Sequence, residues 1–149
     1  MITIPHLSTA KIRWISLLLG AGIFIWSRLE ENAVQTVIVL AFITVTLGFG
    51  MWIAHGQGGR IIHKRGAFLG FSLFGALIGL STSVGSALLM LLKNGSHGHL
   101  IPDYPTGLLF AMLNRAPLWA LCGALIGVGI FSMWVTIRPP EIQTSDESL

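Results

Sequence analysis

An uncharged stretch, residues 66–92, constrains the fold more than any other part of the sequence. It is longer than the ~20 apolar residues that cross a hydrocarbon core of ~30 Å as a helix. It contains the pentapeptide GALIG at residues 75–79, which recurs at residues 123–127 in a second apolar run. Soluble domains have ~25% charged residues, whereas this chain has 10% charged and 53% hydrophobic residues. The sequence therefore predicts an all-α integral membrane protein.

The apolar runs predict one membrane domain over residues 1–138 with four transmembrane helices. The spans are expected at about residues 12–28, 33–54, 66–92 and 117–137. The second run is rich in Val, Ile and Thr, but a lone strand in lipid would leave its backbone groups unpaired, so a helix is expected. The first run is short, and the hydrophobic region of a cleaved signal peptide is the alternative reading. We expect this run to be retained, because no small-residue cleavage pattern follows it.

A short apolar helix is predicted between the third and fourth spans, over residues 107–113. Running this helix straight into the fourth span would bury Arg115 and set Pro117 inside a helix, where proline costs ~3 kcal/mol. Treating Pro117 as the first turn of a new helix avoids that cost. We therefore expect the short helix to lie on the membrane surface. Residues 139–149 are polar and acidic, and are predicted to form a disordered tail.

Aromatic and basic residues support this arrangement and orient it. The five tryptophans fall near the predicted span ends, where an indole keeps its ring in lipid and its N–H in water: Trp14, Trp26, Trp52, Trp119 and Trp134. One side of the membrane collects Lys11, Arg13, Arg60, Lys64, Arg65 and Arg138, and the other collects Arg28, Lys93 and Arg115. Because basic residues favour the inner side, both termini are predicted to be cytoplasmic, or stromal in a photosynthetic cell.

The small residues of the third and fourth spans predict close helix packing. Leu77 and Leu125, at the centres of the two GALIG copies, lie at ~18 to 20 Å from the same basic boundary, at 1.5 Å per helical residue. Small residues spaced by four let helix backbones approach in lipid. The expected packing residues are Gly75, Gly79, Ser83, Ser86, Gly123 and Gly127. Packing within one subunit, a seam between copies and a groove for a partner all remain open.

The chain has few groups that could carry chemistry. All six acidic residues lie outside the predicted spans, and the histidines lie in loops or at boundaries. We therefore expect no cofactor and no enzymatic activity. His97 and His99 are weak metal candidates, because zinc sites need three or four ligands in fixed geometry and the flanking loop is rich in glycine. No metal is expected.

Two further groups are candidates for binding. Ser81, Thr82 and Ser83 lie near mid-membrane and could line a path for a neutral solute, although such hydroxyls more often bond the helix carbonyl one turn earlier. The basic loop residues Arg60, Lys64 and Arg65 could contact anionic lipid headgroups. Nine basic residues scattered over span ends make no continuous basic face, so nucleic acid is not an expected partner.

The segment from His97 to Gly127 carries a Pro-Asp-Tyr-Pro turn, an Arg-Ala-Pro-Leu-Trp entry and a glycine-rich span. In these features it resembles small uncharacterised multi-span membrane proteins of cyanobacteria and other photosynthetic organisms. The resemblance implies a thylakoid or plasma membrane setting, and it implies no activity.

Two functions fit the sequence. The first is an accessory, assembly or regulatory subunit that packs through glycine-lined helix faces, with the lipid bilayer and a larger membrane complex, or a second copy, as its partners. The alternative is a small oligomeric transporter or channel for a neutral solute. The absence of charge from the predicted spans favours the first, because coupled transport usually needs an ionisable group in the membrane.

Overall fold

The computed structural model of the protein describes residues 2–3, 8–29, 33–56, 61–62, 64–96 and 102–137. These residues form five helices and one small sheet. The helices are α1 (Thr9–Arg28), α2 (Val34–Gly56), α3 (Lys64–Ser96), α4 (Thr106–Asn114) and α5 (Ala116–Ile137), and the strands are β1 (Ile2–Thr3) and β2 (Ile61–Ile62). The prediction of an all-helical chain with four long apolar helices is confirmed.

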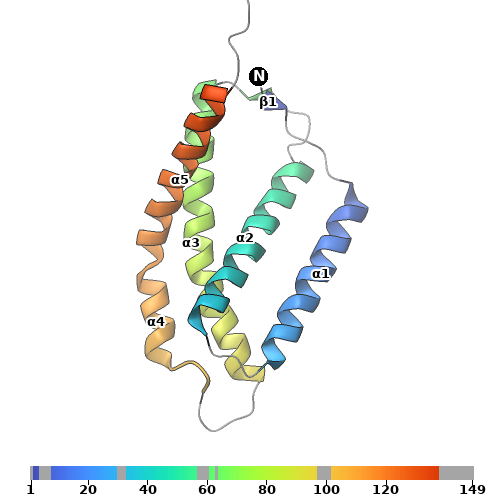
Figure 1. Cartoon of the computed structure of the whole chain (residues 1–149), viewed down its shortest axis with the longest axis vertical. Coiled ribbons are helices and arrows are strands. Elements are labelled where there is room, and N and C mark those ends of the chain that lie inside the picture. The colour runs from blue at the N-terminus through green and yellow to red at the C-terminus, as the bar shows by residue number, and fades with distance from the viewer. Residues whose placement is uncertain are drawn as a thin grey trace, which may run out of the picture.

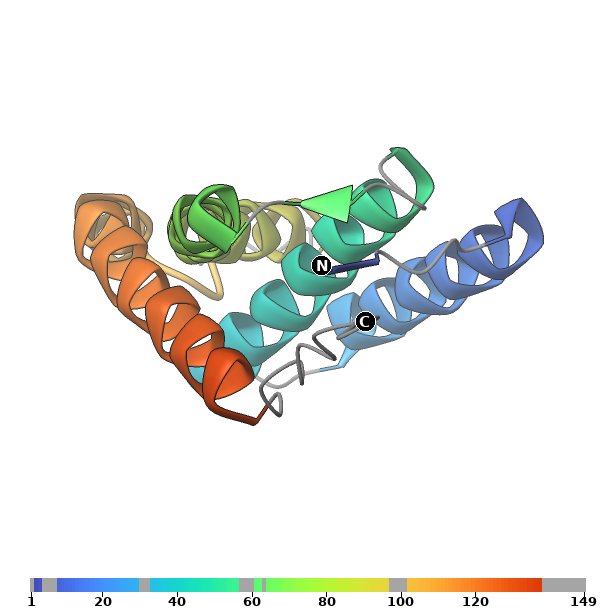
Figure 2. The ribbon, with the colours of Figure 1, turned by 90° about the horizontal axis from the view of Figure 1, so that it is seen from above.

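Helix α3 is the centre of the arrangement. It contacts each of the other four helices, and its most extensive packing is with α5 and then with α2 (Figure 1). Figure 2 shows the helices from above as an open fan, with α5 and α1 at its two sides. Most residues of α1 and α5 are exposed in the isolated chain, and only 6% of the apolar window of each is buried.

The long helices extend slightly beyond most of the predicted spans. Helix α3 shows the largest difference, because it continues through Lys93 to Ser96 whereas the predicted span ends at residue 92. A lysine was expected to end the span at the water interface. In the structure the Lys93 side chain is fully buried. Because its charge is held inside the bundle, α3 can continue past it.

Helix α4 does not lie across the others as the predicted surface helix would. It follows α3 lengthwise and is joined end to end with α5 through the single residue Arg115 (Figure 1). The reason is apolar packing, because Leu109 and Met112 of α4 are buried against Ala87 and Met90 of α3. The tandem of α4 and α5 thus matches most of the length of α3.

The two-residue strands were not predicted. β1 pairs with β2 in antiparallel register, with Ile2 opposite Ile62 and Thr3 opposite Ile61. This pairing holds the start of the chain beside the connection between α2 and α3, at the end of the molecule where α5 also finishes (Figure 1).

The main apolar core lies at the opposite end of the molecule, where α1 ends, α2 begins and α3 ends. We call this the Lys93 end. Its buried members come from α1, α2, α3, α4 and the segment before α4: Trp26, Val37, Ala87, Met90, Tyr104, Leu109 and Met112. The core therefore joins all helices except α5, which is held separately by its seam with α3.

Candidate functional site

The two GALIG segments lie against each other where α3 and α5 pack. A Cβ added to Gly75 would overlap the carbonyl oxygen of Gly123, and one added to Gly123 would overlap the carbonyl oxygen of Gly75. A Cβ added to Gly79 would likewise overlap the Trp119 carbonyl oxygen, and one added to Gly127 would overlap the Phe71 carbonyl oxygen. Any side chain at these four positions would push the backbones apart, so the glycines are what permits this packing.

Of the arrangements considered for the glycine faces, packing within one subunit is the one seen in this chain. The face of α3 that carries Gly75 and Gly79 is filled by α5 of the same chain. It is not free to hold a second copy or another protein without separating the two helices. The four glycines are therefore packing residues within one subunit.

Three hydroxyl groups in the middle of α3 are directed at backbone carbonyls. Thr82 donates to the Ile78 carbonyl and Ser86 donates to the Thr82 carbonyl, both at 2.8 Å and one turn back in the helix. The Ser83 hydroxyl instead crosses to α4 and donates to the Met112 carbonyl at 2.5 Å. All three side chains are buried. Thr82 and Ser83, two of the three predicted solute-lining residues, are thus engaged in helix contacts.

The Ser83 bond lies at the break between α4 and α5. Pro117 has no N–H, so it cannot donate to a carbonyl of the preceding turn. The Arg115 N–H donates to the Met112 carbonyl at 3.2 Å, and the Trp119 N–H donates to the Arg115 carbonyl at 3.0 Å. The carbonyl that loses its donor to Pro117 is that of Leu113, four residues earlier. Ser83 instead gives the neighbouring Met112 carbonyl a second donor and so ties α3 to the end of α4.

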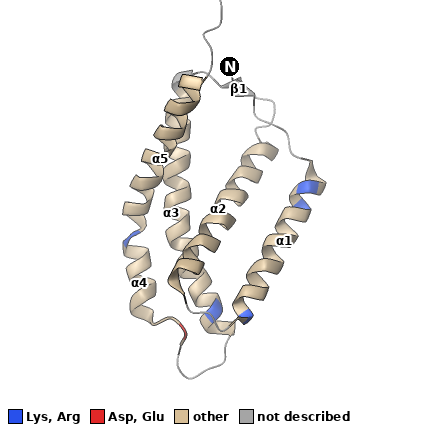
Figure 3. Cartoon of the chain, viewed as in Figure 1, with Lys and Arg blue, Asp and Glu red and all other residues tan. Residues whose placement is uncertain are grey.

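Arg115 lies at this break with its side chain exposed. The contacts of Gly79 with Trp119 and of Ser83 with Met112 place the break level with the middle of α3. The sequence had grouped Arg115 with Arg28 and Lys93 on one side of the membrane. Figure 3 shows a basic residue at the joint of α4 and α5, well apart from those at the lower ends of α1 and α3. Arg115 therefore does not share their level.

The Lys93 side chain lies at the edge of the apolar core, far from the break between α4 and α5. It is 0% exposed, and its ammonium nitrogen lies 4.9 Å from the centre of the Trp26 ring. A cation over an indole face is attracted by the ring quadrupole, and the attraction is strongest when both groups are removed from water. Trp26 is itself buried. This contact ties the end of α1 to the end of α3.

Asn94 holds the segment that leads into α4. Its amide nitrogen donates to the Tyr104 carbonyl at 2.8 Å, and its amide oxygen accepts from the Tyr104 N–H at 2.9 Å. The two bonds satisfy both backbone groups of a buried residue. Sequence reasoning missed Trp26, Lys93 and Asn94 as a structural cluster, since nothing in their spacing indicates that they meet.

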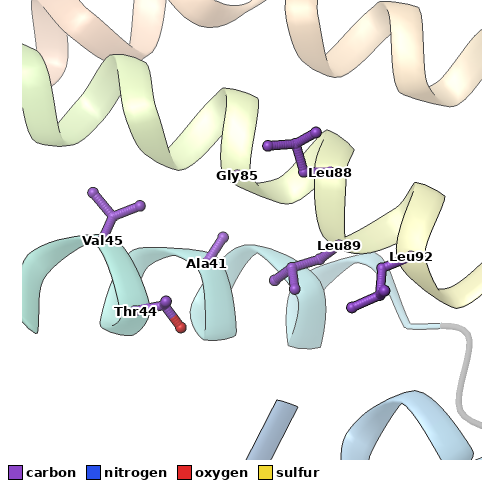
Figure 4. Close-up of a pocket in the computed structure, with 7 residues that line it drawn as sticks. All are labelled: Ala41, Thr44, Val45, Gly85, Leu88, Leu89 and Leu92. Atoms are coloured by element: carbon purple, nitrogen blue, oxygen red, sulfur yellow. The ribbon is translucent and has the colours of Figure 1, made fainter. Parts of the chain in front are cut away.

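An apolar groove runs between α2 and α3 (Figure 4). It has a volume of about 370 Å³ and is lined by Ala41, Thr44, Val45, Gly85, Leu88, Leu89 and Leu92. The one hydroxyl in its walls, on Thr44, donates to the Leu40 carbonyl of its own helix at 2.8 Å. A second apolar groove is lined by Val45, Gly48, Phe49 and Trp52. Neither groove presents the converging polar groups that fix a small-molecule substrate.

The remaining predicted site residues fall at or beyond the edges of the described structure. His97, His99 and Arg60 lie outside the described residues, as do residues 139–149. Lys64 and Arg65 begin α3. Among the residues that the structure describes, no three His, Cys, Asp or Glu side chains come together as a metal site would require. Cys122 is exposed on α5 and forms no disulfide.

Comparisons of the chain with protein-family models, with curated proteins and with solved structures found no match.

Proposed function

We propose that the chain is an integral membrane protein, that α1, α2 and α3 cross the bilayer, and that α4 and α5 cross it together as one tandem. Large apolar side chains cover the outside of the helices, including Leu18, Phe24, Leu73, Leu125 and Met133, all more than 60% exposed. Soluble monomers rarely expose contiguous apolar surface on this scale. In a bilayer the same side chains contact acyl chains. A membrane-spanning helix therefore does not need to bury most of its apolar side chains against other helices.

The most favourable position of the bilayer is set by α1 and α2. These helices have 20 and 23 residues, so each is ~30 to 35 Å long, about the hydrocarbon thickness. The basic residues near the ends of α1, Lys11, Arg13 and Arg28, can extend their charged groups to the two interfaces. Both helices have one end at the Lys93 end of the bundle, where Arg28 and Lys93 lie. The hydrocarbon region then begins near Lys93 and extends ~30 Å along α3. Arg115, level with residues 79–83 of α3, falls near its middle.

A bilayer shifted to bring Arg115 to its boundary would be less favourable. The shift would expose to water the apolar side chains near the Lys93 end, among them Phe24, Ile25, Leu88, Leu92 and Phe110, which are 50–66% exposed in the isolated chain. Covering a Leu, Ile or Phe side chain is worth ~1.5 to 3 kcal/mol each. One arginine at mid-membrane costs ~2.5 to 3.5 kcal/mol on insertion scales. The shift would also leave α1 and α2 too short to cross the hydrocarbon region, because each has one end at the Lys93 end and is only ~30 to 35 Å long.

We propose that this protein acts as an accessory or assembly subunit of a larger membrane complex. The observation that carries the proposal is where its central polar and small residues go: the hydroxyls of Thr82, Ser83 and Ser86 bond backbone carbonyls, and Gly75 and Gly79 contact α5. These interior residues therefore stabilise the packing of the helices. The large apolar surface that contacts no other helix of the chain lies on the outside. The positive-inside rule supports termini on the cytoplasmic or stromal side.

Native electrophoresis in a mild detergent tests this proposal. Antibody to the chain should detect it in a band much larger than the monomer, and that band should contain the same second protein after two orthogonal separations. Migration only as a monomer or a small homo-oligomer would contradict it. The alternative, a transporter for a neutral solute, would then be tested by solute flux into proteoliposomes.

A further inference from the structure

The exposed position of Arg115 implies a specific kind of partner, and this inference rests on the membrane placement proposed above. Arg115 is flanked on the outside of α4 and α5 by exposed apolar side chains, Phe110, Leu113, Leu118 and Leu121. Its level on α3, between Gly79 and Ser83, is ~15 to 20 Å from Lys93 along the helix axis. A permanent charge is therefore surrounded by lipid-facing surface near mid-membrane.

None of the chain's acidic positions falls within the bounds of the helices that the structure describes. Its six acids are Glu30, Glu31, Asp103, Glu141, Asp146 and Glu147, and none lies in a long helix. A second copy brings the same set, so in a parallel homo-oligomer the described helices also supply no carboxylate at this level. The arginine stem can carry its guanidinium toward the Lys93 end, but it covers only part of the distance to the headgroups.

We propose that Arg115 marks a docking surface for a membrane-spanning helix of a different protein, one that carries an aspartate or glutamate near its midpoint. The guanidinium would pair with that carboxylate, a contact that is strong because both groups would otherwise be unsatisfied in lipid. The surface comprises the outer faces of α4 and α5 around the break, with Phe110, Leu118 and Leu121 as its apolar part. Charge complementarity selects the partner and apolar contact supplies the remaining area.

The chain provides its own reporter for a test. Cys122 is its single cysteine, is exposed, and lies two helical turns beyond Arg115 on α5, therefore on the same side of that helix. The full chain is labelled at Cys122 with a fluorescent donor and reconstituted in phosphatidylcholine vesicles. An acceptor-labelled synthetic helix of ~20 Leu and Ala residues is added, with Glu, Gln or Leu at its centre or with Glu moved to one end.

Energy transfer should be greatest with the central Glu helix. Interhelical polar contacts in membranes imply an association ~3- to 30-fold stronger than that of the Leu helix. The preference should persist in Arg115→Lys and vanish in Arg115→Met, a substitution at an exposed position that leaves the fold intact by size-exclusion chromatography. Equal transfer to the Glu and Leu helices in the unsubstituted protein overturns the proposal.

A depth measurement separates failure of this inference from failure of the membrane placement. Spin labels are attached to Leu113→Cys and Leu118→Cys, each combined with Cys122→Ser, so that Arg115 is kept. Both labels should be more accessible to oxygen than to a water-soluble nickel chelate, unlike a label at Arg28→Cys. If both labels lie within the hydrocarbon region but the Glu and Leu helices bind equally well, only the proposal of an acidic partner helix is overturned. That result would indicate that lipid phosphate neutralises Arg115. Labels at the water interface would overturn the placement itself.

Discussion

Gly75 of α3 and Gly123 of α5 contact each other so closely that a methyl group on either would overlap the carbonyl oxygen of the other. The contact is reciprocal, and it repeats one turn away in each direction through Gly79 and Gly127. Close backbone approach of this kind replaces, in lipid, the hydrophobic gain that joins helices in water. It is the reason that α5, which shares none of the core at the Lys93 end, remains attached to α3.

Replacing Gly75 with alanine should destabilise the protein by ~1 to 3 kcal/mol, the usual cost of overpacking a close contact. The overlapped atoms are backbone and cannot rotate away. The free energy of unfolding can be measured by SDS titration of the protein in dodecyl maltoside micelles. Gly70→Ala is the matched control, because a Cβ there meets nothing within 4 Å. Equal stability of the two variants would refute the seam.

Removing the hydroxyl in Ser83→Ala should cost ~0.6 to 2 kcal/mol, as measured for interhelical hydrogen bonds in membrane proteins. The loss leaves the Met112 carbonyl at the break of α4 and α5 with one fewer donor. The same SDS titration applies, and hydrogen exchange should quicken in α4. Ser132→Ala serves as the control, since the Ser132 hydroxyl is exposed and bonds only its own helix. Unchanged exchange in α4 would contradict this role of Ser83.

Trp26→Leu should lower the free energy of unfolding by ~1 to 3 kcal/mol, through the lost cation–π attraction to Lys93 and the cavity left in the core. Trp26→Phe should lower it less, because it keeps an aromatic face over the ammonium group. Trp14→Leu changes a tryptophan that is 69% exposed on the same helix and should have little effect. A ranking in which Trp14→Leu is the most destabilising would argue against the contact.

Asn94→Ala should release the segment before α4, because the buried Tyr104 backbone loses both of its side-chain partners. The expected cost is ~1 to 3 kcal/mol for leaving such groups unsatisfied. Mass spectrometry after hydrogen exchange should show faster labelling of a peptide that contains Tyr104. Asn114→Ala, at an exposed asparagine, is the comparison. Slow labelling in Asn94→Ala would disprove the anchoring role.

The four long helices could be predicted from the sequence because length and apolarity are properties of each segment alone. The level of the two GALIG copies also followed from local arithmetic, since a helix rises by a constant amount per residue. The arrangement of α4 could not be obtained in this way. A proline and an arginine at residues 117 and 115 suggested a surface helix, but the burial of Leu109 and Met112 against α3 outweighs that local preference.

Three properties can be predicted from the residues alone: the chain is helical, four of its segments are long enough to span a bilayer, and two of them carry matching small residues. These follow from backbone hydrogen bonding and from the thickness of the hydrocarbon region, which act on one segment at a time. Three others emerge only when the helices are packed: α5 fills the glycine face of α3, Lys93 is buried under Trp26, and Arg115 is level with the middle of α3. These depend on how helices distant in sequence are aligned, and contacts among many side chains set that alignment together.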